Sequence, residues 1–204
     1  MTTIQKVLNH VLIAAALTGV AASAAEPFIR AGASYTYAKF DPLTRQTGWE
    51  AGPVISTGYT FGSTNQQEIS LESGWAKWTG TSAVGGSKFE STQIPVLLDY
   101  RYSFALSKDY RLFVGPSAGF IHQKYEKTNT AFPALLGGTD NSWEPAYGGT
   151  VGLIAKLGKN WDAQLAYELL LVSGDDIRTG TSGSLTSNPD YTRSSFQLTF
   201  GCAF

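Results

Sequence analysis

Residues capable of covalent or metal chemistry are few in this chain and widely spaced. Its 204 residues include one cysteine, Cys202, and two histidines, His10 and His122. A single cysteine excludes an intramolecular disulfide and offers no zinc or redox spacing. No glycine-rich phosphate loop, metal-ligand spacing or catalytic triad is visible either. We therefore expect no catalytic residues, no metal site and no bound cofactor.

A second set of chemically capable residues consists of charges that share sequence parity with small and hydroxylated residues. They are Glu68, Glu72, Asp99, Arg101, Lys156, Asp162 and Glu168. If the turn at 158–160 pairs Leu157 with Trp161, then Lys156 and Asp162 face each other on adjacent strands. Glu68, Glu72, Asp99 and Arg101 should likewise cluster between two neighbouring strands. An unpaired buried charge is unfavourable by several kcal/mol, so these residues are predicted to form one ion-paired polar network.

The elements that must position these charges are strands, because two-residue alternation recurs along the chain and no sustained 3.6-residue period is present after its N-terminal region. The clearest example is the last segment, where Phe196, Leu198, Phe200, Cys202 and Phe204 alternate with polar or small residues. Cys202 lies on its apolar face, so we interpret it as a small apolar residue. Eight such strands are predicted, over 29–37, 49–61, 68–75, 93–104, 110–120, 144–157, 161–171 and 191–204.

The connections between these strands alternate between long and short. Short turns follow the second, fourth and sixth strands, and the longest loops are Lys127–Asn141 and Ser173–Asp190. A terminal strand with a bare edge is an aggregation hazard unless another strand covers it. The first strand is the obvious partner. The predicted fold is therefore all-β, an eight-stranded antiparallel up-and-down barrel.

Alternation alone does not say which face points outward, and a soluble lipocalin-type barrel would place its apolar face inside. Only 15% of the residues are charged, against about 25% in soluble domains. Aromatic residues gather near both strand ends, among them Trp49 at one end and Phe28 at the other, as in the girdles of membrane barrels. Lys39, Lys77 and Lys124 have apolar-face parity but lie at strand ends, where a lipid-facing Lys costs only about 0–1 kcal/mol. The apolar face is thus predicted to meet lipid.

The N-terminal segment has the features of a secretory signal peptide. Lys6 precedes an apolar run over 11–25, which is too short to cross about 30 Å of hydrocarbon as a helix. Ala22 and Ala24 supply the small-x-small cleavage pattern. We predict a signal peptide at 1–25 and a barrel domain at 26–204. The alternative is a retained N-terminal anchor or a core helix.

Several phrases resemble the small OmpA-barrel and OmpX-like families, also described as the outer-membrane β-barrel domain family. They are 71–74 (LESG), 94–102 (IPVLLDYRY), 114–120 (VGPSAGF) and the C-terminal Phe204. The resemblance implies the outer membrane of a Gram-negative cell, with both mature termini periplasmic. It also implies that the outer-membrane assembly machinery recognises the last strand through Phe196, Leu198, Phe200 and Phe204. No peptidoglycan-binding domain follows Phe204, so wall anchoring is not expected.

The functional expectation is a structural or surface-interaction role through the extracellular loops. Eight strands give an interior just wide enough for side chains to fill, so the lumen is predicted to be plugged. A narrow porin passing small solutes or ions is the alternative. The expected partners are outer-membrane lipids and an unidentified surface ligand or host partner. A net charge of −1 gives no basic surface for nucleic acid, and we expect a monomer.

A surface lipid-modifying enzyme is a third alternative. Related barrels that deacylate lipid A, transfer palmitate or cleave proteins use histidine with serine or a carboxylate. A deacylase-like arrangement would require a serine two residues after His122, where this chain has Lys124. We therefore interpret His122 as an interfacial side chain near lipid headgroups.

Overall fold

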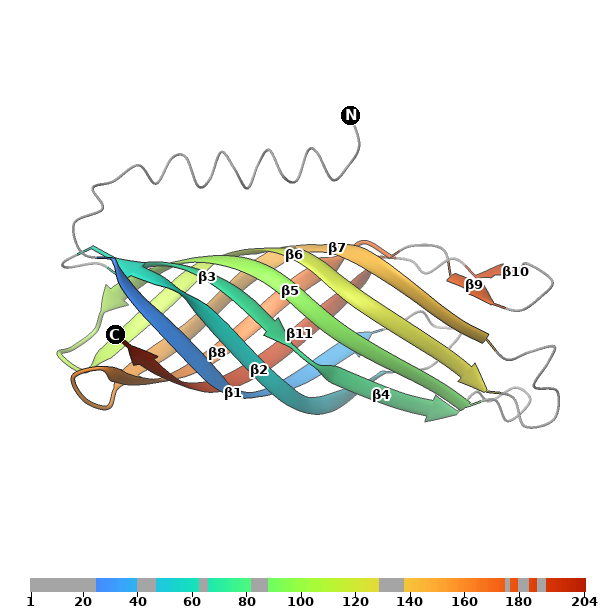
Figure 1. Ribbon diagram of the computed structural model, residues 1–204, viewed down its shortest axis with the longest axis horizontal. Coiled ribbons are helices and arrows are strands. Elements are labelled where there is room, and N and C mark those ends of the chain that lie inside the picture. Colours follow the sequence, from blue (N-terminus) through green and yellow to red (C-terminus); the bar gives the residue numbers. More distant parts are fainter. Residues whose placement is uncertain are drawn as a thin grey trace, which may run out of the picture.

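A computed structural model describes residues 25–39, 47–62, 66–81, 88–128, 138–174, 177–179, 184–186 and 190–204. These residues form a closed, elongated barrel of antiparallel strands (Figure 1). Within the described residues, no helix is long and apolar enough to cross a membrane. The predicted signal peptide lies outside them except for Ala25, so it stays a prediction.

The barrel strands run in sequence order around the wall. They are β1 (Glu26–Lys39), β2 (Thr47–Phe61), β3 (Gln67–Gly74), β4 (Ala76–Thr81), β5 (Lys88–Ala105), β6 (Tyr110–Thr128), β7 (Gly138–Lys156), β8 (Trp161–Val172) and β11 (Tyr191–Ala203). β3 and β4 keep one register against β5, with Ser73 opposite Val96 and Ala76 opposite Gln93. They are one barrel strand interrupted at Trp75. The predicted eight-stranded barrel is therefore confirmed.

The barrel closes as the terminal strands predicted, because β1 pairs with both β2 and β11. Partners can be followed around the wall from Ile29 through Thr57, Leu71, Leu98, Ala118, Tyr147, Leu171 and Thr192 to Lys39. The circuit returns ten residues further along β1. A stagger of this size tilts eight strands by about 40° from the barrel axis.

The two ends of the barrel differ. At the turn end lie the short connections 62–66, 106–109 and 157–160 together with the first residue of β1 and the last of β11. Gly62 has φ 97° there, a left-handed conformation that favours glycine in a tight turn. The opposite, loop end carries the longer connections. It also carries a two-stranded hairpin of β9 (Ile177–Thr179) and β10 (Ser184–Thr186).

Strands at the loop end extend further than the sequence pattern indicated. β6 continues to Thr128 and β7 begins at Gly138, so the predicted loop Lys127–Asn141 is shorter than expected. The predicted loop Ser173–Asp190 contains the β9–β10 hairpin. The reason is physical: beyond the lipid both faces of a strand meet water, so polar residues occupy both faces and the alternation that marked the strands is lost.

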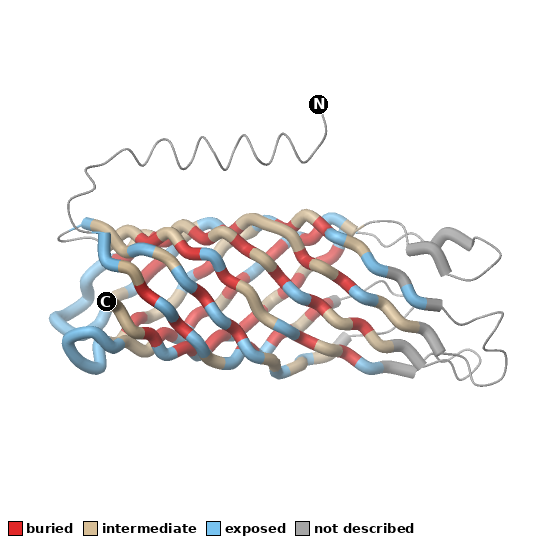
Figure 2. Tube along the Cα trace, viewed as in Figure 1, coloured by how far each residue is buried: buried red, intermediate tan, exposed pale blue. Residues whose placement is uncertain are grey.

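Burial alternates along every barrel strand, and Figure 2 shows the resulting pattern of buried and exposed positions. On β11, Phe196, Leu198 and Phe200 are about half exposed while Ser195 and Gln197 are buried. The apolar face therefore points outward and the polar face lines the lumen. The expected place of Phe28 in an aromatic girdle is wrong. Phe28 is buried inside the barrel, because it shares sequence parity with Arg30 rather than with Ile29.

Exposed aromatics lie near both strand ends. Towards the loop end, Tyr35 stacks on Trp49 with ring centroids 4.9 Å apart, and Trp49 lies 5.7 Å from Phe196. Towards the turn end, Tyr102 and Phe104 meet edge to face at 4.9 Å. Such belts are typical of the two interfaces of a membrane-spanning barrel.

Candidate functional site in the barrel lumen

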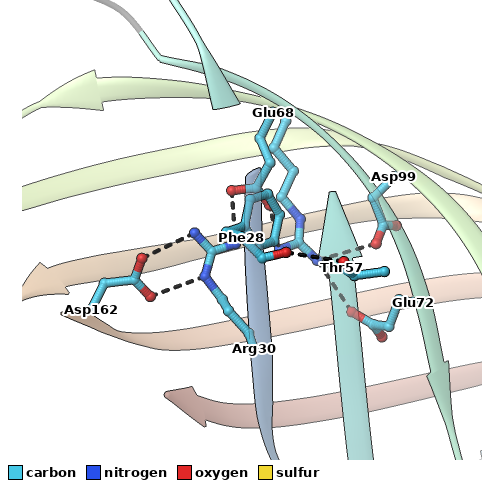
Figure 3. A network of polar contacts seen from close by, with 8 residues as sticks. Phe28, Arg30, Thr57, Glu68, Glu72, Asp99 and Asp162 are labelled. Atoms are coloured by element: carbon cyan, nitrogen blue, oxygen red, sulfur yellow. Dashed lines mark hydrogen bonds and ion pairs between the residues drawn. The ribbon is translucent and has the colours of Figure 1, made fainter. Parts of the chain in front are cut away.

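Arg101 on β5 is the centre of a buried ionic cluster in the lumen. Its Nη1 lies 3.2 Å from Glu68 Oε1, and its Nη2 lies 3.2 Å from both Glu72 Oε2 and Asp99 Oδ2. Figure 3 shows the carboxylates converging on this side of the lumen. The structure thus brings together the four residues expected between these neighbouring strands, β3 and β5.

Arg30 on β1 extends this cluster across the lumen, and the sequence analysis did not place it in the network. Its Nη1 lies 2.7 Å from Glu68 Oε2, while Nε and Nη2 donate to the two oxygens of Asp162 at 2.9 and 3.1 Å (Figure 3). The guanidinium also lies over the Phe28 ring, with Cζ 4.1 Å from the centroid. The available signal was a charge in the middle of an alternating strand, flanked by Ile29 and Ala31.

Lys156 and Asp162 are neighbours but not an ion pair. They are register partners on β7 and β8, as the predicted turn required. Asp162 nevertheless accepts from Arg30 through both oxygens. A planar guanidinium matches a carboxylate in two-point geometry, whereas Lys156 at the barrel end is exposed and keeps its ammonium in water. The predicted facing of Lys156 and Asp162 is therefore confirmed, whereas the expected place of Lys156 in the ion-paired network is wrong.

Two further contacts link β11 to the cluster side of the lumen. Arg193 Nη1 lies 2.8 Å from Glu168 Oε1 on β8. Gln197 Nε2 donates to Glu72 Oε1 at 2.6 Å, which joins β11 to β3. The lumen cluster, as we name it, comprises Arg30, Glu68, Glu72, Asp99, Arg101, Asp162, Glu168, Arg193 and Gln197. It connects β1, β3, β5, β8 and β11 through the barrel interior.

The buried ion pairs of the lumen cluster make it costly to separate the strands or open the lumen. Its described members include three arginines and five carboxylates, all but Asp162 buried. Removing one partner from a buried pair leaves an uncompensated charge and costs about 3–5 kcal/mol. Within the described residues, no group of His, Cys, Asp and Glu is arranged to hold a metal ion. The cluster can therefore brace the wall.

An apolar layer lies on the loop-end side of the lumen cluster, and sequence reasoning missed it. Its members are Ala38, Ala76, Trp78, Leu97, Ile121, Ala146, Leu170, Val172 and Tyr191. Leu97, Ile121 and Leu170 are completely buried. For these three residues the signal was present, since each sits in a run of consecutive apolar residues, namely Leu97-Leu98, Phe120-Ile121 and Leu169-Leu170-Leu171. Such a run leaves both faces of a strand apolar.

Tyr191, at the loop-end side of the apolar layer, also belongs to a second polar group that closes the lumen. Gln93 Nε2 donates to Tyr191 Oη at 2.7 Å, and that hydroxyl lies 3.0 Å from Glu144 Oε2 and 3.2 Å from Gln123 Oε1. These residues come from β5, β6, β7 and β11. The lumen is thus filled by an ionic, an apolar and a hydrogen-bonded layer in succession.

The outer surface carries the remaining residues that the sequence singled out. His122 packs against Trp143 with ring centroids 4.9 Å apart. Lys77 lies 2.5 Å from Glu90, and Lys124 pairs with Glu126, all at the loop end. The Lys39 side chain lies outside the described residues. Directly after β11, Phe204 is 74% exposed and its N–H donates to Pro27 O at 3.0 Å.

Solved structures with the same fold share little sequence with this chain. Neisserial surface protein A aligns with a TM-score of 0.58 at 12% identity, covering 87% of this chain and 97% of that one. Ail, the attachment invasion locus protein of Yersinia pestis, aligns at 0.57 and 13% over 88% and 99% in a complex with the heparin analogue sucrose octasulfate. OprG of Pseudomonas aeruginosa aligns at 0.53 and 14% over 89% and 96%.

Among proteins with curated functions, none has a recognisably similar sequence. The sequence over residues 11–204 matches the family described as "Outer membrane protein beta-barrel domain". That match covers nearly the whole chain and agrees with the closed antiparallel barrel and its lipid-facing apolar surface. This chain therefore belongs to the outer membrane protein beta-barrel domain family.

Proposed function

We propose that this protein is a closed outer-membrane barrel with a structural or surface-interaction role at its loop end. The observation that carries the proposal is the lumen itself, which is filled by three successive layers of side chains. An ion entering from the turn end would have to separate the pairs of the lumen cluster, including Arg101 with Glu68 and Glu72, both 3.2 Å away. It would then meet the apolar layer that contains Leu97 and Ile121.

The length of the strands supports a role outside the membrane. β5, β6 and β7 contain 18, 19 and 19 residues, whereas a tilted strand crosses the hydrocarbon with about 9–11. Their loop-end segments, with the Lys77–Glu90 and Lys124–Glu126 pairs, therefore project beyond the apolar band. The candidate contact regions Lys127–Asn141 and Ser173–Asp190 continue from this projection, and much of each lies outside the described residues.

The comparison with Ail is compatible with such a role, because that protein is named for attachment and its structure holds a heparin analogue. The likeness shows the fold alone at 13% identity. What carries over is an architecture in which a rigid, closed barrel presents loops from long strands. We propose a surface ligand or host molecule as the partner at the loop end, with the protein acting as a monomer.

Planar-bilayer recording of refolded protein tests the closed lumen. We expect no steady conductance from the wild type, and none from Arg101→Ala, because the apolar layer remains. Arg111→Ala at the turn-end mouth is the matched control. A large conductance rise in Arg101→Ala, with folding retained, would instead support the narrow porin with Arg101 as its gate.

An enzymatic role on lipid A makes a separate prediction. His122 contacts Trp143, and its ring forms no hydrogen bond to a serine or carboxylate in the described part of the chain. We expect lipid A from cells expressing the protein to have an unchanged mass. A mass change that disappears in His122→Ala would overturn the non-enzymatic proposal.

The location of the protein in the outer membrane, and the side that its termini face, are tested by a separate measurement. We propose that residues 1–25 are removed on secretion and that both ends of the mature chain face the periplasm. Outer-membrane fractionation, with heat-modifiable migration as the folding signal and N-terminal sequencing for the cleavage site, tests these points together. A soluble periplasmic product would contradict them.

A further inference from the structure

The turn-end mouth of the lumen contains a pocket that is lined in part by residues of the lumen cluster. It has a volume of about 70 Å³ and opens between β1, β6, β7 and the turn at 157–160. Its charged lining residues are four cations and three carboxylates: Arg30, Arg111, Lys156, Lys159, Glu26, Glu68 and Asp162. Phe28 and Ile154 line it as well. Charged side chains outnumber apolar ones in the lining, so the pocket suits a small polar ligand better than an apolar one.

Pairing inside the pocket leaves cations in excess. Arg30 forms ion pairs with both Glu68 and Asp162. Those two carboxylates are therefore not available to the other cationic side chains of the pocket. Arg111 and Lys156 form no ion pair with any described residue, and Arg111 Nη1 is a buried donor atom with no hydrogen-bond partner. A buried donor left unpaired costs about 1–3 kcal/mol, so this position favours an acceptor.

The register places these two cations side by side. Arg111 is opposite Ile154 on β7, and Lys156 follows Ile154 by two residues on the same, lumen-facing side. Lys156 N–H also donates to Asp109 O at 2.8 Å, which holds its backbone against the start of β6. Diagonal neighbours on adjacent strands are within reach of long side chains. One small anion can therefore contact both.

We propose that this mouth binds a soluble phosphate-class oxyanion, with Arg111 and Lys156 as its ligands. A guanidinium and an ammonium together match a doubly charged oxyanion better than a single carboxylate, and arginine presents paired donors to phosphate oxygens. Glu26 at the rim is the chain's own competing anion. The site faces the lumen rather than the lipid surface, so its ligand comes from the aqueous compartment at the turn end.

The test is an NMR titration of refolded protein in a phosphate-free maltoside detergent at low ionic strength. Inorganic phosphate should shift the Arg111 Nε–Hε signal and the Lys156 side-chain signals saturably. Arg111→Gln and Lys156→Gln should each weaken binding about tenfold or more. Lys108→Gln, a charge-matched change in a neighbouring turn outside the pocket, should change it less than about twofold. Heat-modifiable migration verifies that each variant is folded.

Several results would overturn the proposal. They are the absence of saturable shifts at either cation, wild-type affinity in folded Arg111→Gln and Lys156→Gln, and an equal loss in Lys108→Gln. Acetate should bind more weakly than phosphate, and Glu26→Gln should bind phosphate more tightly. Whether the bound anion is a soluble phosphate or a lipid headgroup is tested by adding phosphatidylglycerol to the micelles in place of phosphate. Shifts seen only with the lipid would contradict a soluble ligand. Bilayer closure is measured separately, so this site can fail without affecting the proposed function.

Discussion

The indole nitrogen of Trp78 on β4 donates a hydrogen bond to the backbone carbonyl of Gly48 on β2, across 3.1 Å. In the described residues no ladder pairing joins β2 to β4. Just before β4 begins, a backbone bond to β2 runs from Trp75 N to Pro53 O at 3.1 Å. A Cβ at Gly52 would collide with Trp75 O, whereas one at Gly48 would meet nothing within 4 Å. The strands therefore diverge towards the loop end, and the Trp78 indole bridges the gap.

Replacing Trp78 with phenylalanine should weaken the wall at this gap. The change removes the donor to Gly48 O and part of a ring that is only 3% exposed, so we expect a loss of about 1–3 kcal/mol in unfolding free energy. Urea unfolding of refolded protein in detergent measures it. Hydrogen exchange at the loop-end half of β2 should also accelerate. Trp143→Phe, on the exposed outer face, is the control and should change stability by less than about 0.5 kcal/mol. Equal losses in both variants would contradict a bridging role.

The sequence predicted the fold and the facing of each strand well. Ile29 and Arg30 differ by one position and lie on opposite faces of the wall, which a period of two requires. The short connection at 158–160 correctly predicted the strand register, in which Lys156 lies opposite Asp162. Local turn geometry and alternation were sufficient for these features because both act between residues close in sequence.

The partners inside the lumen could not be predicted in the same way. Asp162 bonds to Arg30, 132 positions away in the chain, and that contact depends on a stagger that accumulates over the whole circuit of strands. The apolar layer was missed for a different reason. Leu97 and Leu170 belong to runs of consecutive apolar residues. Such runs do not fit an alternating pattern, although they indicate a strand with both its lipid-facing and its lumen-facing sides apolar.

Glu68 should be the most sensitive carboxylate of the lumen cluster. It receives Arg30 at 2.7 Å and Arg101 at 3.2 Å, so Glu68→Gln keeps the shape but leaves two buried guanidinium groups with less countercharge. We expect a destabilisation of about 3–5 kcal/mol, measured by urea unfolding. Glu26→Gln removes the same charge from an exposed rim position and should have little effect. A Glu68→Gln protein as stable as Glu26→Gln would show that the cluster does not brace the barrel.

Gly201 on β11 leaves room for the Arg30–Asp162 pair. A Cβ at Gly201 would approach Arg30 Cγ to 2.5 Å and Asp162 Oδ1 to 2.8 Å, closer than real Cβ atoms approach their neighbours. Gly201→Ala should therefore displace the pair and cost about 1–3 kcal/mol. Gly158→Ala, where a Cβ would meet nothing within 4 Å, is the matched control. In an Asp162→Asn background the Gly201→Ala cost should shrink. Additive losses would mean that the alanine disturbs something other than the pair.

Phe204 should matter more for assembly in cells than for stability. The residue is 74% exposed, so its side chain stabilises the isolated barrel little, and the bond from its backbone N–H to Pro27 O survives substitution. We expect Phe204→Ala to refold in detergent with wild-type stability but to reach the outer membrane at several-fold lower levels, because the C-terminal strand is proposed to be the segment read by the assembly machinery. Phe104→Ala provides the comparison, since Phe104 is also exposed on the outer face near the turn end. Quantitative blotting of membrane fractions compares the outer-membrane levels of the two variants. Equal levels would remove Phe204 from the recognition signal and leave Phe196, Leu198 and Phe200 as its candidates.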